Sequence, residues 1–169
     1  MVMDSTEEKV SKILGELSPA MREITVGNFA SEFNGGALRK EERVMAEAIF
    51  RASLRDDIMS VRQSMSEQLK RNARLPHDIA VVLAKDVAEV ALPIVRHSPV
   101  LTDSDLVNIV ESRELDFQLA VAKRKRLTEP VSDALIDTEA QQVVSTLMGN
   151  TGAQIAPFAH FRVIWELYT

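Results

Sequence analysis

The chain has 169 residues, of which 46% are hydrophobic and 27% charged, a composition typical of a soluble globular domain with a sizeable core. It contains no cysteine, which excludes disulfides, thiol nucleophiles and thiolate metal sites, and its net charge of -5 argues against nucleic-acid binding as a global property. No apolar run approaches the roughly 18 residues of a membrane-spanning helix, and the N-terminal residues lack the pattern of a secretory signal. We therefore expect a cytoplasmic protein of bacterial type that does not associate with a membrane.

The first third of the chain predicts two or three helices separated by a turn signal. Apolar residues recur there at helical spacing, and Ser18 and Pro19 suit the N-cap and the first position of a new helix. The sequence NGG at residues 34–36 then ends this helix, because its residues accept left-handed backbone geometry. We place a domain boundary there, between an N-terminal helical arm (residues 1–36) and a helical repeat domain (residues 37–169).

The rest of the chain repeats one pattern at intervals of 26, 26 and 28 residues, measured between the apolar residues Leu75, Leu101, Leu127 and Ile155. Each of these residues precedes an amphipathic helix, which starts with a threonine N-cap or has a proline in its first turn. The threonines are Thr102 and Thr128, and the prolines are Pro76, Pro130 and Pro157. A second short helix precedes each one, and because neither helix can bury its apolar face alone, the pairs must stack. This spacing predicts an all-α fold, an α-solenoid of short HEAT-like helical hairpin repeats; the alternative is a non-repeating helical bundle.

Three stretches of the repeat region are similar to a known bacterial family. They are LPHDIAVVLAKDVAEVALPIVRHSPVLTDSDLVNIVES from Leu75, LAVAKRKRLTEPVSDALI from Leu119 and VVSTLMGNTGAQI from Val143. The chain resembles this family, catalogued as domain of unknown function 2336, over residues 38–169, and HSPVLTDSDL is the most specific element. The resemblance implies a HEAT-like helical fold and brings with it no catalytic residues and no cofactor.

Basic residues precede three of the four repeated apolar positions. They are Lys70, Arg71 and Arg74; then Arg96 and His97; then Lys123, Arg124, Lys125 and Arg126. Stacked helices lie about 8–10 Å apart, so we expect these residues to form one basic ridge. Acidic residues, among them Asp56, Asp57 and Asp86, occupy the turns of the opposite edge. Helix dipoles stabilise both placements and are one explanation. The other is a binding site for an acidic protein surface, a phosphorylated partner or a nucleic-acid backbone.

The remaining polar candidates indicate structure rather than chemistry. His77, His97 and His160 are far apart and show no metal-ligand spacing, so we expect no metal site. Asp103 and Asp105 form a carboxylate pair, but their place in a first helical turn favours capping over acid–base catalysis. We expect no cofactor and no enzymatic activity. The competing hypothesis is an enzyme with an unrecognised pocket of coupled titratable groups.

Aromatic residues form one face of the last predicted helix, and they are Phe158, Phe161, Trp165 and Tyr168. Terminal repeats normally carry a polar cap, which this helix lacks. Either the native chain continues, or a partner covers the face, and a homodimer through this helix or the N-terminal arm is one such arrangement. In the alternative, Trp165 packs on Val143 and Leu147 of its own repeat.

These patterns favour a non-catalytic protein–protein interaction scaffold with a regulatory or signalling role, which binds an acidic or phosphorylated partner through the basic ridge. The alternative is a HEAT-like nucleic-acid-binding module that uses the same ridge. Nucleic acid is the less favoured partner, because the total charge is negative and no aromatic residues for base stacking are interleaved with the basic ones.

Overall fold

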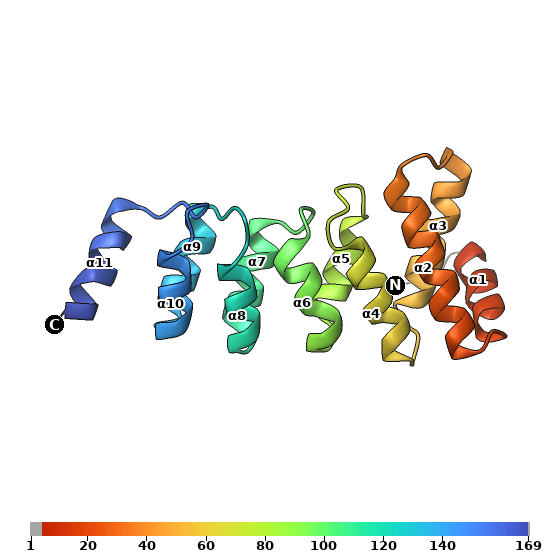
Figure 1. Cartoon of the computed structure of the whole chain (residues 1–169), viewed down its shortest axis with the longest axis horizontal. Coiled ribbons are helices and arrows are strands. Elements are labelled where there is room, and N and C mark those ends of the chain that lie inside the picture. Colours follow the sequence, from red (N-terminus) through yellow and green to blue (C-terminus); the bar gives the residue numbers. More distant parts are fainter. Residues whose placement is uncertain (1–4, 169) are drawn as a thin grey trace. The chain divides into compact units, whose positions relative to one another are not determined.

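The computed structural model describes residues 5–168, with side chains up to residue 165, and these residues form eleven helices and no strand (Figure 1). The helices are α1 (Ser5–Gly15), α2 (Pro19–Gly35), α3 (Lys40–Ser53), α4 (Met59–Leu69), α5 (His77–Ala84), α6 (Ala88–His97), α7 (Asp103–Ser112), α8 (Leu115–Ala122), α9 (Glu129–Asp137), α10 (Gln141–Met148) and α11 (Pro157–Tyr168). They confirm the predicted all-α fold class. None of the helices in this described part is long and apolar enough to cross a bilayer.

The helix starts follow the predicted interval. Four helices, α5, α7, α9 and α11, begin at His77, Asp103, Glu129 and Pro157, which lie 26, 26 and 28 residues apart. A second helix precedes each of them, as the hairpin pattern requires. The predicted spacing of the helices is therefore confirmed, whereas the HEAT-like character of the repeats stays a prediction.

Contacts divide the chain into two compact units, and unit 1 comprises the residues up to Ile94 together with Ser98–Val100. Within it α1 packs on α3, and α2 packs on both α3 and α4. The buried rings of Phe33 in α2 and Phe50 in α3 meet edge to face, with centroids 5.3 Å apart. The described part of the N-terminal arm thus belongs to unit 1, and the domain boundary predicted after Gly36 stays a prediction.

Unit 2 comprises Val95–His97 and the residues from Leu101 onward. Within it α7 packs on α8 and α9, α10 packs on α8 and α9, and α11 packs on α9. Fully buried side chains include Leu135 of α9 and Leu147 of α10. Each such burial contributes about 1.5–3 kcal/mol. Packing therefore stabilises these helices, since segments this short are marginal on their own.

The sequence predicts N-caps at Ser18, Thr102 and Thr128, and the capping hydrogen bond of the side chain forms at two of them. The Ser18 hydroxyl accepts a hydrogen bond from a backbone N–H in the first turn of α2, and Thr102 forms a reciprocal capping box with Asp105 at the start of α7. Both caps confirm the prediction. Thr128 lies at the N-cap position of α9, but its hydroxyl donates to Oδ2 of Asp103 at 2.8 Å and does not cap its own helix. The predicted N-cap position of Thr128 is therefore confirmed, but its hydroxyl bonds the first turn of α7 and makes no capping hydrogen bond to α9.

Candidate functional site

Four consecutive cations, Lys123–Arg126, form the turn between α8 and α9, which we call the basic turn. The backbone N–H groups of Lys123 and Arg124 still donate to carbonyl oxygens in the last turn of α8, at 3.1 and 3.0 Å. The first two cations therefore prolong the end of α8, where the helix dipole favours positive charge.

The backbone of the basic turn is held by residues 150–154, which connect α10 to α11. Asn150 donates from Nδ2 to the carbonyl oxygens of Ala122 and Arg124, at 2.8 Å each. Leu127, which follows the turn, forms a parallel bridge with the same segment, and its N–H and carbonyl bond to it at 3.1 and 2.9 Å. The basic turn is therefore fixed at both of its ends by a segment of the following repeat.

Gly152 permits the close approach of these two segments. A Cβ atom at Gly152 would lie 1.9 Å from the carbonyl oxygen of Lys125, which is far inside van der Waals contact. The sequence GNTG shows only that residues 149–152 form a turn. The sequence could not show that this turn also holds the basic turn, because residues 149–152 and the basic turn meet only in the folded unit.

Arg124 differs from the other three cations because its side chain is half-buried. Its Nη1 donates to the carbonyl oxygen of Val95, in the last turn of α6. Burial lowers the pKa of the Arg124 guanidinium, and the carboxylate of Asp103 opposes this shift. Because an arginine stays protonated in a protein, its charge satisfies a helix-end carbonyl that lacks an intrahelical donor. Arg124 thus has a structural role, which the ridge pattern did not indicate.

The other cations of the basic turn, Lys123, Lys125 and Arg126, are exposed. Arg96 is exposed as well, and it lies at the end of α6 that Arg124 contacts. Within residues 5–165, none of these four exposed side chains takes part in an ion pair or a side-chain hydrogen bond. We call the four the cationic cluster.

The remaining cations of the predicted ridge, Lys70, Arg71 and Arg74, lie in unit 1. Lys70 pairs with Glu67 in the last turn of α4, and Arg74 donates from Nη1 to the carbonyl oxygen of Gly36 at 3.5 Å. Arg71 is exposed. Two of these three cations therefore make contacts within unit 1, and a ridge that continues through both units stays a prediction.

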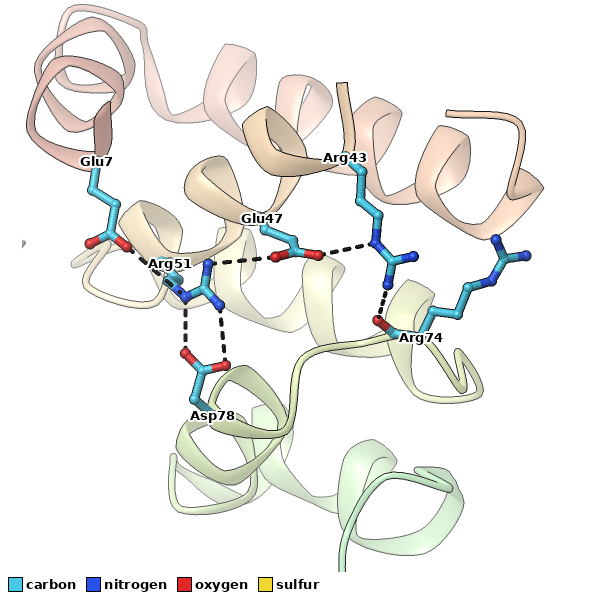
Figure 2. Close-up of polar contacts among 6 residues, drawn as sticks. All are labelled: Glu7, Arg43, Glu47, Arg51, Arg74 and Asp78. Atoms are coloured by element: carbon cyan, nitrogen blue, oxygen red, sulfur yellow. Dashed lines mark hydrogen bonds and ion pairs between the residues drawn. The ribbon is translucent and has the colours of Figure 1, made fainter. Parts of the chain in front are cut away.

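A chain of ionic contacts runs along α3 in unit 1 (Figure 2). Arg51 lies 2.9 Å from Asp78 and 3.8 Å from Glu47, and it reaches Glu7 at 4.0 Å. Glu47 also pairs with Arg43 at 3.2 Å. The hydrogen bond from Arg51 lowers the pKa of Asp78, and burial opposes this shift. These contacts join α1, α3 and α5 and neutralise charges that are far apart in the sequence.

The acidic edge predicted from the sequence is partly neutralised in unit 1. Asp56 pairs with Arg22 at 2.9 Å, and Asp86 binds Arg62 through two hydrogen bonds of 2.7 and 3.1 Å. Burial raises the pKa of Asp86, but hydrogen bonds from Arg62 and from a backbone N–H outweigh it, so that the pKa is lowered. Asp57 is exposed. The sequence pattern did not indicate that Arg22 and Arg62 neutralise this edge, because each lies more than 20 residues from its partner, at separations of 34 and 24.

The histidines and one groove of unit 2 show no arrangement typical of catalysis or metal binding among the described residues. His77 and His160 are exposed and His97 is half-buried, and no group of three potential ligand side chains is arranged for a metal ion among the described residues. A groove of about 560 Å³ in unit 2 is lined mainly by side chains of α10, with Val163 of α11, and Glu139 is the titratable residue of its lining. This groove therefore offers no pair of coupled acid–base groups.

The predicted aromatic face of α11 is largely exposed. Phe158 is 80% exposed, Phe161 61% and Trp165 62%, and the rings of Phe161 and Trp165 stack with centroids 6.3 Å apart. The side chain of Tyr168 lies outside the described residues. The exposure of Trp165 argues against the alternative in which this ring packs into its own repeat.

Residues 90–166, which contain the basic turn and most of α11, match a known family. Its description is "Uncharacterised protein conserved in bacteria (DUF2336)". Residues 90–166 are therefore similar to this family, and we call them the DUF2336 segment. The match confirms the resemblance predicted from the sequence, over a shorter range than the predicted residues 38–169. No curated protein and no solved structure matches the chain. Within the DUF2336 segment lie Arg96 and the three exposed cations of the basic turn, so the whole cationic cluster belongs to it.

Proposed function

We propose that the chain is a non-catalytic interaction module of the cytoplasm, with a regulatory or signalling role. In this proposal the cationic cluster binds an acidic or phosphorylated segment of a partner protein. The observation that carries the proposal is the exposure of Lys123, Lys125 and Arg126 on a turn whose backbone is fixed at both ends.

The fixed backbone of the basic turn favours binding for an entropic reason. A turn that is already ordered loses little conformational freedom when it binds an anion. Hydrogen bonds to charged groups contribute about 1.5–3 kcal/mol each when they form. Arg126 can bind two oxygens of one carboxylate or phosphate, whereas Lys123 and Lys125 supply compact point charges. Together with Arg96 these groups suit a short acidic segment.

The charge around the cluster favours a protein partner over a nucleic acid. The chain carries a net charge of -5, and the acidic residues Asp103 and Glu129 lie next to the basic turn. A long phosphate backbone extends over more of this acidic surface than a short acidic segment does, so it is repelled more strongly. The basic turn also contains no aromatic side chain on which bases could stack.

The proposal can be tested by affinity capture from a bacterial lysate with three forms of the chain. They are the wild type, a Lys125→Glu/Arg126→Glu variant, and a Lys9→Glu/Lys12→Glu variant that makes the same charge change at exposed positions of α1. We expect the wild type and the α1 control to retain a partner that the first variant loses. Phosphatase treatment of the lysate separates a phosphorylated partner, which would be lost, from an acidic one, which would remain.

Equal recovery of the partner by the Lys125→Glu/Arg126→Glu variant would contradict the proposal. Binding of duplex DNA or RNA that weakens steeply with salt would favour the nucleic-acid alternative instead. Arg124 is left unchanged in this test, because its half-buried charge serves the fold and its loss would destabilise unit 2.

A further inference from the structure

The last helix of unit 2, α11, is apolar on two opposite faces. Ala159 and Val163 are buried, and α11 packs on α9. Arg162 also ties the helix to α9, since its Nη2 lies 2.7 Å from Oδ1 of Asp137. A surface helix needs only one apolar stripe. The second one on α11 therefore requires its own explanation.

The outward face of α11 carries four apolar side chains, which we call the aromatic stripe: Phe158, Phe161, Ile164 and Trp165. At 100° per residue they lie on the side of the helix opposite Ala159 and Val163. Ile164 is 46% exposed, and the three aromatic residues are more exposed than that. Exposed large apolar residues elsewhere in the described chain, such as Ile13 of α1, number at most two on any one helix. Small exposures of that kind are ordinary, whereas a continuous stripe of four marks an interaction surface.

The area of the aromatic stripe matches a modest interface. Aromatic side chains bury 150–250 Å² each, so the exposed fractions of the three rings leave about 400 Å² of aromatic surface. Two such stripes facing each other would remove about 800 Å², and Ile164 with the surrounding side chains brings the total towards the ~1,200 Å² of the smallest specific interfaces. A pair of stripes therefore suffices for a reversible dimer.

We propose that the aromatic stripe binds the same stripe of a second copy of this chain, with the two α11 helices antiparallel about a two-fold axis. A two-fold interface needs a surface that is complementary to itself. The stripe meets this condition because none of its four side chains is charged, so no like charges meet when it faces its copy. The flanking Arg162 is already paired with Asp137 in its own protomer.

The antiparallel arrangement also makes a specific pairing. With the axis between residues 161 and 162, Phe158 of one copy lies opposite Trp165 of the other, and the two Phe161 rings meet near the axis. Aromatic pairs of this kind contribute beyond their buried area. The stacking of Phe161 on Trp165 orders two of the rings before association, which lowers the entropic cost of binding.

Sedimentation velocity and tryptophan fluorescence of the full chain test this proposal. Trp165 is the one tryptophan in the sequence, so its emission reports on the stripe alone. We expect the mass to rise from monomer to dimer between about 1 and 300 µM, with a blue shift of the emission over the same range. Phe158→Glu and Phe161→Glu should each weaken the dimer by at least about 30-fold, because aromatic anchors dominate interfaces. Ile13→Glu, at an exposed position of α1, is the matched control and should leave the dimer unchanged.

A mixing experiment tests the antiparallel register. Phe158→Glu and Trp165→Lys should each be monomeric alone, and a mixture of the two should recover dimer, because Glu and Lys then face each other and the second Phe–Trp contact is native. A monomeric wild type over the whole concentration range would overturn the proposal. Emission that is already blue-shifted in the monomer would overturn it too, since another part of the chain would then cover Trp165. Dimer formation that persists in both Phe158→Glu and Phe161→Glu would also overturn the proposal.

Discussion

The contact between Asn150 and the basic turn leads to a prediction of the stability of unit 2. The Asn150 side chain donates to the carbonyl oxygens of Ala122 and Arg124 at 2.8 Å and accepts the Gly152 N–H at 2.9 Å. Asn150→Ala removes all three hydrogen bonds and leaves a carbonyl of the buried residue Ala122, at the end of α8, without this donor.

Each of these hydrogen bonds contributes about 0.5–1.5 kcal/mol net, so the expected loss on Asn150→Ala is about 3 kcal/mol. For a chain of this size the midpoint of thermal unfolding should fall by about 6–12 °C. Urea unfolding followed by far-UV circular dichroism measures the loss of free energy. Hydrogen exchange at Leu127, whose N–H donates to the Gly152 carbonyl, should accelerate in the variant and localise the effect to the basic turn.

Thr151→Ala provides the matched control, because Thr151 is the exposed neighbour of Asn150. Its substitution should change the free energy of unfolding by no more than about 0.5 kcal/mol. If Asn150→Ala were as stable as Thr151→Ala, the basic turn would not depend on this side chain. The fixed turn would then no longer favour anion binding by Lys123, Lys125 and Arg126.

Further predictions concern charge, backbone geometry and pH. Arg124→Glu should lower the free energy of unfolding by several kcal/mol, because it reverses a half-buried charge beside a carbonyl oxygen. The free energy of unfolding of Arg126→Glu, at an exposed position, should stay within about 0.5 kcal/mol of wild type, and urea unfolding compares the two variants. Gly36→Ala should lower the free energy of unfolding by at least about 1 kcal/mol, since Gly36 has φ of 71° and a Cβ there would lie 2.2 Å from the guanidinium of Arg74. A midpoint of thermal unfolding equal to that of the wild type would contradict this prediction. Asp86 has a lowered pKa in the folded chain, so it stabilises the fold above the unfolded pKa of about 3.9, and this contribution disappears as the pH falls through the folded pKa. Asp86→Asn should therefore flatten the loss of stability below about pH 4, and an acid unfolding curve identical to wild type would argue against the Arg62 pair.

Helix positions and several caps could be predicted from the sequence because they depend on neighbouring residues. The periodic leucines placed the starts of α5, α7 and α9, and Ser18 and Thr102 cap as expected. Such features depend on hydrogen bonds that span three or four residues, so a short stretch of chain contains all the information they need.

The roles of individual charges could not be predicted in the same way. In the sequence the four cations of the basic turn are equivalent, and Thr128 follows a leucine at a helix start as Thr102 does, although the third helical residue is Val131 after Thr128 and Asp105 after Thr102. Only packing shows that Arg124 faces a helix end that belongs to another repeat and that Thr128 finds a carboxylate on α7. Such a pairing depends on how two helices approach each other, which no local pattern specifies.

The sequence by itself therefore determined that this chain is helical, where its helices begin, and that cations gather before its repeated apolar positions. The tertiary structure decided which cations are exposed and which are used internally. Arg124, Lys70 and Arg74 serve the fold, whereas Lys123, Lys125 and Arg126 remain exposed on a turn that Asn150 holds from the next repeat. The physical reason is that helix formation depends on short-range hydrogen bonds and apolar periodicity, while the burial of Arg124 and the fixing of its turn depend on contacts between residues more than 20 positions apart.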